Sequence, residues 1–176
     1  MAGTKKSAKA ATRPSERTNA RLYTLDVHIM RGPISESFGK KNPVLCRTIQ
    51  IRGNQTLQDL HFAIFAAFDR EEEHLYEFQF GKRPIDPNGP RYVMPHPLDF
   101  SFDDGGPLAA GQTDKTTIDS LGLQIRSRFA YWFDFGDDWW HQINVEAIED
   151  APASGKYPKV TKKVGKSPPQ YPDWEE

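Results

Sequence analysis

Residues 128–148 read RFAYWFDFGDDWWHQINVEAI, two alternating apolar and polar runs on either side of an acidic turn. Odd-numbered positions are mostly apolar and even-numbered positions mostly polar, which is typical of an antiparallel hairpin with one buried face. A three-residue loop, Gly136–Asp137–Asp138, would keep both apolar sets on the same face. The stretch therefore predicts a hairpin that contributes aromatic side chains to the core.

The same alternation predicts which residues face each other across this hairpin. A shift of one residue would turn the apolar side chains to solvent, so the loop length sets the register. At the open end of the hairpin, Arg128 and Glu146 would form a cross-strand pair of opposite charges, which stabilises a sheet. The predicted pairs are Phe135 with Trp139, Phe133 with His141, Tyr131 with Ile143, Phe129 with Val145, and Arg128 with Glu146.

Charge is distributed unevenly over the 176 residues. Residues 22–150 carry 12 basic and 20 acidic side chains, a net charge of −8, whereas the two ends together carry 11 basic and 4 acidic, a net charge of +7. An acidic domain repels phosphates, so nucleic acid would be held only weakly and through the basic ends. We expect a disordered basic tail over 1–20, one domain over 21–150 and a Pro/Lys-rich tail over 151–176.

The cysteine content and the hydropathy exclude several protein classes. Cys46 is the only cysteine, which excludes an intrachain disulfide and any zinc site built from several cysteines. No apolar run approaches the roughly 18 residues of a membrane span, and the N-terminus lacks the apolar stretch of a secretory signal. These features predict a cytoplasmic protein that does not associate with membranes.

Periodicity and turn residues predict the remaining elements. Thr56 is predicted to be a helix N-cap, and Asp59, three residues later, is predicted to complete a capping box with it. Strands are expected at 23–29, 44–51, 75–80 and 91–94, a helix at 57–68, loops at 31–43 and 82–114, and a short helical turn at 116–123. A hairpin followed by a helix across a mixed sheet is the β-grasp, or ubiquitin-like, arrangement. We predict an α+β fold of this type with one main helix, a long insertion and an extra C-terminal hairpin strand.

Several of these segments resemble the plasmid Ri ORF-3-like family over residues 22–150. The resemblance rests on 23–29, Thr56-Leu57, Leu60-His61, Ile64, His74-Leu75, Phe78, and above all 131–138 with Trp139 or Trp140 and His141. It implies a mixed fold similar to the β-grasp, an origin in plasmids or mobile elements, and no settled biochemical activity. Some members are labelled resolvase-like, but serine recombination needs arginines around a phosphate, and the acidic domain shows no such cluster. Where many members have Gly-Trp after the helix, this chain has Asp69-Arg70.

Acids and histidines around the hairpin turn form the candidate polar site. Imidazole and carboxylate groups are the ligand set of zinc, manganese or iron, so a divalent metal is the cofactor that they would bind. The structural interpretation is simpler, because an Asp in a tight turn accepts backbone N–H groups and a buried His packs as a flat ring. The candidate residues are His61, His74, Asp134, Asp137, Asp138 and His141.

Trp132 and Trp140 fall on the polar face of the predicted hairpin, where large aromatic rings need cover. The cover would come from the chain itself or from a protein partner, which makes these two residues candidates for a partner surface. We favour a non-catalytic interaction or accessory protein to which no catalytic residue is assigned. The alternatives are a metal-dependent enzyme using the turn at 134–141 and a nucleic-acid accessory protein acting through its basic tails.

Overall fold

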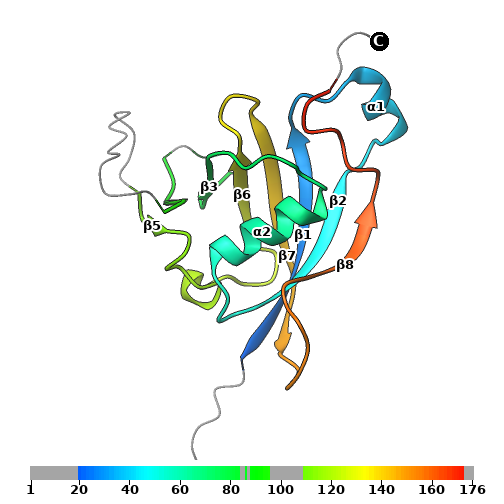
Figure 1. Cartoon of the computed structure of the whole chain (residues 1–176). Helices are drawn as coiled ribbons and strands as arrows, with labels where there is room; N and C mark the ends of the chain where they lie inside the picture. The colour runs from blue at the N-terminus through cyan, green and yellow to red at the C-terminus, as the bar shows by residue number, and fades with distance from the viewer. Residues whose placement is uncertain (1–19, 84–85, 87, 96–108, 173–176) are drawn as a thin grey trace, which may run out of the picture.

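The structure is a computed structural model that describes residues 20–83, 86, 88–95 and 109–172 (Figure 1). Its centre is an eight-stranded sheet of order β5-β4-β3-β6-β7-β1-β2-β8. Helix α2 crosses one face of this sheet, and α1 lies at the end where the C-terminal segment returns. The strands are β1 (Arg21–Arg31), β2 (Cys46–Arg52), β3 (Tyr76–Gln79), β4 (Arg91–Val93), β5 (Gly111–Gln112), β6 (Arg128–Phe133), β7 (Trp139–Asp150) and β8 (Lys159–Val164); the helices are α1 (Glu36–Lys41), α2 (Leu57–Ala67) and the 3-10 turn η1 (Asp119–Leu121).

The expectation of an α+β fold with a mixed sheet is confirmed, but its β-grasp form is not. Strand β1 lies between β2 and β7 and runs antiparallel to both. Within the described sheet, the parallel pairing joins the short strands β4 and β5 at one edge. The sheet is therefore built from antiparallel neighbours around β1, and β8 extends it beyond the predicted strands.

Helix α2 forms as predicted, because its first turn is capped from both directions. The Thr56 hydroxyl accepts the backbone N–H of Asp59 at 3.2 Å, and the Asp59 carboxylate accepts the backbone N–H of Thr56 at 2.8 Å. The apolar side chains of the helix pack on the sheet, where each buried large side chain contributes roughly 1.5–3 kcal/mol. The fully buried core residues are Tyr23, Leu25, Val27, Ile49, Ile51, Leu57, Leu60, Phe68, Phe78, Ile118, Trp139 and Ile143.

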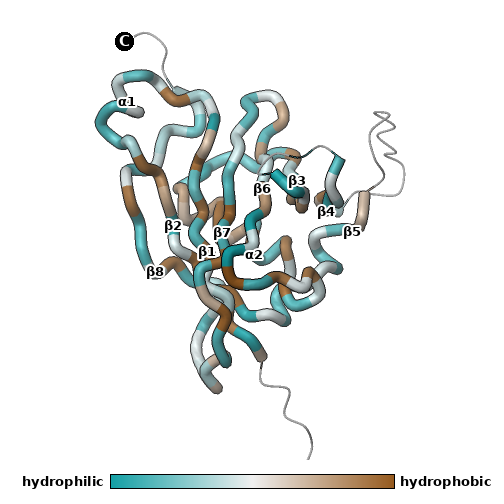
Figure 2. The backbone as a smooth tube through the Cα atoms, turned by 180° about the vertical axis from the view of Figure 1, so that it is seen from behind, coloured by the Kyte–Doolittle hydropathy of each residue, from teal (hydrophilic) through white to brown (hydrophobic). Residues whose placement is uncertain are grey.

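The β6–β7 hairpin forms, but the predicted register was wrong by two residues. Phe133 lies opposite Trp139, and Arg128 lies opposite Asn144 instead of Glu146. Because the difference is even, the apolar residues still pack in the core with α2. Figure 2 shows hydrophobic and hydrophilic segments following one another along the strands of the sheet. The connection spans Asp134–Asp138 in place of the predicted three residues.

The backbone angles and side-chain hydrogen bonds of two aspartates explain this longer turn. Asp134 and Asp138 have φ angles of 54° and 63°, in the left-handed region that Asp tolerates better than most residues. The Asp134 carboxylate accepts the backbone N–H groups of Gly136 and Asp137, both at 3.2 Å. The turn therefore closes around the Asp134 side chain. These local hydrogen bonds favour a five-residue connection over the predicted three-residue loop.

Two segments that we expected to lack regular structure contain elements. Helix α1 lies in the predicted loop at 31–43, where Ser35 accepts the backbone N–H of Phe38 as N-cap. The predicted tail at 151–176 contains β8, which pairs antiparallel with β2. Most residues of β8 are exposed and three are lysines, as is typical of edge strands, so composition alone suggested a tail.

Arg47 connects β2, α2 and the C-terminal segment. Although its side chain is buried, its guanidinium donates to the Ala67 carbonyl at 2.9 Å, to the Val164 carbonyl at 2.9 Å and to the Ser167 hydroxyl at 3.0 Å. Ser167 in turn donates to Asp69, which follows α2 with a φ of 54°. The end of α2 is thus capped by a side chain from the sheet.

Candidate functional site

The predicted site residues lie on both faces of the sheet and do not converge. His61 and His141 are on the face covered by α2, whereas Asp138 binds the two tryptophans of the opposite face. No three of the six candidates bring ligand atoms close enough together to share a metal ion. A metal centre at this turn therefore lacks the geometry that it requires.

His61 is the middle member of a hydrogen-bonded chain that runs from buried Tyr131 to exposed Glu73. Its Nδ1 lies 2.8 Å from the Tyr131 hydroxyl and its Nε2 lies 3.1 Å from the Glu73 carboxylate, while its ring stacks on Tyr76 at 3.6 Å. Burial lowers the pKa of His61 to about 3, so the contact with Glu73 is a hydrogen bond of a neutral ring. One tautomer satisfies all three groups: Tyr131 donates to Nδ1, and Nε2–H donates to Glu73.

His74 and Asp134 meet at the edge of the same region. His74 Nε2 lies 3.4 Å from Asp134 and 2.7 Å from the Tyr171 hydroxyl, which donates to Glu72 at 2.9 Å. Asp134 is mainly engaged with the backbone of its own turn, as described above. These contacts attach the C-terminal segment to the loop that follows α2.

Asp138 organises the aromatic residues on the opposite face. Its Oδ1 accepts the indole N–H groups of Trp132 at 2.9 Å and Trp140 at 2.8 Å, and its Oδ2 lies 2.5 Å from Arg31. The two indoles stack at 4.8 Å with an angle of 7° between their planes, and Phe135 covers Trp132 at 4.1 Å. The chain itself thus supplies cover for this face, and a partner surface at Trp132 and Trp140 stays a prediction.

Most polar residues of the turn therefore already have structural partners. Asp134 holds the backbone, Asp138 holds the two indoles, and the backbone N–H of Asp137 binds Asp134. His141 differs from them. Its Nδ1 lies 3.3 Å from the Tyr131 carbonyl, but its buried Nε2 has no hydrogen-bond partner among the described residues.

Arg70, a residue that our sequence analysis did not assign to the site, lies beside His141 and Trp139. It follows α2, is 8% exposed, and its guanidinium carbon lies 3.7 Å from the centre of the Trp139 ring. Its two terminal nitrogens, Nη1 and Nη2, and the indole Nε1 of Trp139 are buried without partners within the described part of the chain. Because Arg70 stands in the charged run 69–73, the sequence suggested only a solvated helix end.

The electrostatics of this group favour an added acceptor. Burial lowers the pKa of Arg70 to about 10 although the charge of Asp134 opposes this shift, so the side chain is still charged at neutral pH. Burial, together with the Arg70 charge, lowers the pKa of His141 to about 3, so this ring is neutral. A buried charged group without hydrogen bonds costs several kcal/mol, which makes bound water or a bound anion the expected partner. We name Arg70, Trp139 and His141 the Arg70 site.

Comparison with known proteins shows where this chain belongs. A family model described as plasmid pRiA4b ORF-3-like protein matches residues 37–171. The chain belongs to this family. The match confirms the family resemblance seen in the sequence; it begins after β1, at residue 37, and extends past residue 150 to include β8.

The plasmid pRiA4b ORF-3-like chain also has a similar solved structure. That structure is described as a protein of unknown function from Methanosarcina mazei Go1; it shares 28% sequence identity and a TM-score of 0.60 over 83% of this chain and 71% of that one. No curated protein is similar enough to count as a match. These findings indicate no specific activity.

None of the helices in the described ranges has the length and hydropathy needed to cross a membrane.

Proposed function

We propose that this protein is a non-catalytic binding domain that takes up a small oxyanion at the Arg70 site. The observation that carries the proposal is the set of unpartnered buried nitrogens, namely Nη1 and Nη2 of Arg70, Nε1 of Trp139 and Nε2 of His141. Three of these four atoms are donors with no acceptor. Native proteins rarely leave such groups unsatisfied, so their occurrence on a buried cation, on the ring below it and on a histidine within its electrostatic reach points to a ligand.

The tautomer of His141 narrows the chemistry of the ligand. Because Nδ1–H donates to the Tyr131 carbonyl, Nε2 is an acceptor and needs a donor opposite it. Hydrogen phosphate offers both acceptor oxygens for Arg70 and a hydroxyl for His141. A carboxylate offers only acceptors, so it would need a proton taken up by His141 on binding. Both kinds of ligand are therefore oxyanions that bind together with one proton, which is carried by the ligand or taken up by His141.

Entry to the site requires local opening, because the four nitrogens are closed to solvent. The neighbouring C-terminal segment is held by Gln170, whose side chain accepts the N–H groups of Glu71 at 2.8 Å and Glu72 at 3.1 Å and donates to the Glu72 carbonyl at 2.8 Å. The residues directly after Arg70 are thus tied to this segment. We propose that its release admits the ligand.

A binding role is also supported by the placement and contacts of the nearest thiol and hydroxyl groups. Cys46 lies in β2 and Ser120 in η1, and the Ser167 hydroxyl near Arg70 accepts from Arg47 and donates to Asp69. In the His61 chain, burial raises the pKa of Tyr131 well above its usual value. As a wider role we propose an accessory function in plasmids or mobile elements, with a protein partner carrying the anionic group.

Thermal unfolding with added anions tests the proposal. Inorganic phosphate should raise the melting temperature of the full chain with the logarithm of its concentration above the dissociation constant, since a ligand at 100 times that constant adds about 2.7 kcal/mol. Sodium acetate tests the carboxylate, and sodium chloride controls for ionic strength. The stabilisation should be larger at pH 6 than at pH 8 for acetate, because that ligand needs the extra proton.

Two variants separate ligand binding from packing. Arg70→Gln removes the charge, and Arg70→Trp restores the residue type that many family members carry there and keeps a flat ring against Trp139. Both should lose the response to phosphate, while the matched surface variant Arg128→Gln should keep it. Equal responses in the wild type and both Arg70 variants, or none in the wild type, would refute the proposal.

A further inference from the structure

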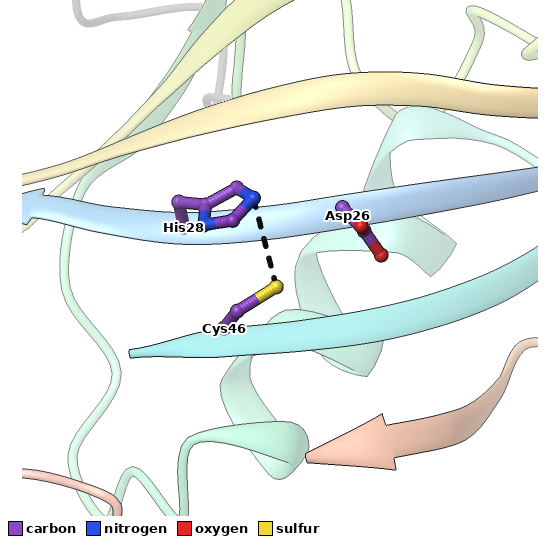
Figure 3. A group of neighbouring side chains, drawn as sticks. All are labelled: Asp26, His28 and Cys46. Carbon is purple, nitrogen blue, oxygen red and sulfur yellow. Dashed lines mark hydrogen bonds between the residues drawn. The ribbon is translucent and has the colours of Figure 1, made fainter. Parts of the chain in front are cut away.

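Three metal-ligating side chains meet on the sheet face opposite α2, away from the Arg70 site. Asp26 and His28 are two residues apart in β1 and so point to the same face, and Cys46 in β2 is the direct cross-strand partner of His28 (Figure 3). The three side chains offer a carboxylate oxygen, an imidazole nitrogen and a thiol sulfur. Among the described residues, these three form the group of His, Cys, Asp or Glu side chains whose ligand atoms lie close enough together to hold a metal ion.

The distances within this cluster approach those of a coordination sphere. His28 Nε2 lies 3.7 Å from Cys46 Sγ, and the ligand atoms of all three residues lie within 4.8 Å of one another. Metal bonds of about 2.3 Å to sulfur and about 2.0 Å to nitrogen, at a tetrahedral angle, separate the two ligand atoms by roughly 3.5 Å. The His28–Cys46 pair already has nearly this separation.

The surroundings hold one ligand in place and leave a path to solvent. The Thr48 hydroxyl donates to Asp26 Oδ1 at 2.6 Å, which fixes the carboxylate as outer hydrogen bonds do around bound metals. Cys46 is 6% exposed, whereas Asp26 and His28 are half-buried. An ion can therefore reach the cluster from the side of β1 while the sulfur stays sheltered.

We propose that Asp26, His28 and Cys46 bind one divalent transition-metal ion of the zinc type, with a water molecule at the fourth position. A sulfur ligand selects zinc or cobalt over magnesium and calcium, which prefer oxygen. Burial raises the pKa of the Cys46 thiol to about 11, so the metal-free side chain is an S–H group. On binding, the S–H bond breaks, its proton passes to solvent, and a metal–sulfur bond forms.

Cobalt(II) titration of the untagged full chain tests this proposal, with the unliganded protein as baseline. Cys46 is the only cysteine of the chain, so a thiolate-to-cobalt charge-transfer band reports this side chain alone. One equivalent of cobalt should develop the band, and zinc should remove it by competition. Cys46→Ser should abolish the band, and Thr48→Val should weaken affinity by about 10-fold through the lost outer hydrogen bond.

Further variants distinguish a three-residue site from binding by the thiol alone. His28→Gln and Asp26→Asn should each weaken cobalt binding by more than the Thr48 variant does. Glu149→Gln removes a carboxylate from an exposed position of β7 opposite Leu22, four residues before Asp26, and should leave affinity unchanged. The proposal is overturned if no band develops, if the band keeps full strength in His28→Gln and Asp26→Asn, or if one cobalt binds per two chains.

Discussion

At the scale of single residues, the two buried histidines make stability depend on pH. The pKa values of His61 and His141 are lowered to about 3 in the folded chain, against about 6.5 when unfolded. Between pH 6.5 and pH 3 the unfolded chain therefore binds more protons, and stability falls as the pH falls. Each histidine should contribute a slope of about 1.4 kcal/mol per pH unit well below pH 6.5.

Urea unfolding at pH 7, 6, 5 and 4 measures this slope. His61→Gln keeps an acceptor for Tyr131 and should reduce the slope by one proton, even if the variant is less stable at pH 7. His74→Gln is the matched control, because His74 is part-exposed at the edge of the turn. An unchanged slope in His61→Gln would show that His61 is protonated in the folded chain.

Asp138 is the second residue whose substitution should be informative. Asp138→Ala leaves two indole N–H groups without acceptors, removes the contact with Arg31 and places Ala at a φ of 63°. We expect a loss of roughly 2–4 kcal/mol of unfolding free energy, because each unsatisfied group costs about 1–3 kcal/mol. Arg31→Gln should cost less than about 1 kcal/mol, since the arginine is exposed. Chemical denaturation of both variants compares the two values.

At the scale of elements, β8 should be required for the stability of the domain. Arg47→Leu would leave the carbonyl groups of Ala67 and Val164 without a donor while filling similar space. We expect a loss of about 3 kcal/mol, and Arg47→Lys should recover only part of it because an ammonium cannot reproduce the guanidinium fork. Hydrogen exchange should show faster opening of β8 and of the last turn of α2 in both variants.

The elements also show what the sequence alone could predict. Strong periodicity and the capping box located β1, β2, β3 and α2, because these signals depend on neighbours in the chain. The register of β6–β7 was missed by two residues, since parity fixes the face but not the pairing. The Lys-rich β8 was missed because its partner, β2, lies far away in the sequence. Arg70 gave no signal, because only the fold places it against Trp139.

At the scale of the whole molecule, the charge distribution limits nucleic-acid binding. The basic residues 1–19 lie outside the described residues, whereas the C-terminal lysines of β8 belong to the sheet. Truncation at residue 150 would therefore test folding as well as charge. Lys162→Gln with Lys163→Gln removes two charges from an exposed strand and keeps its hydrogen bonds.

The acidic region at 22–150 leads us to expect only weak binding to duplex DNA, steeply dependent on salt. Fluorescence anisotropy at 50 and 200 mM salt should show affinity falling by orders of magnitude, and the double lysine variant should reduce the slope. Tight binding that persists at 200 mM salt would instead indicate a specific nucleic-acid surface and would contradict the charge argument.

The paired indoles of Trp132 and Trp140 have an optical consequence. Two aromatic rings stacked at 4.8 Å and nearly parallel couple their electronic transitions, and Asp138 fixes their mutual orientation. The near-ultraviolet circular dichroism of the folded protein should therefore carry an exciton signal that originates at the β6–β7 turn. The molecule contains its own spectroscopic probe, which reports the closure of this turn without any added label.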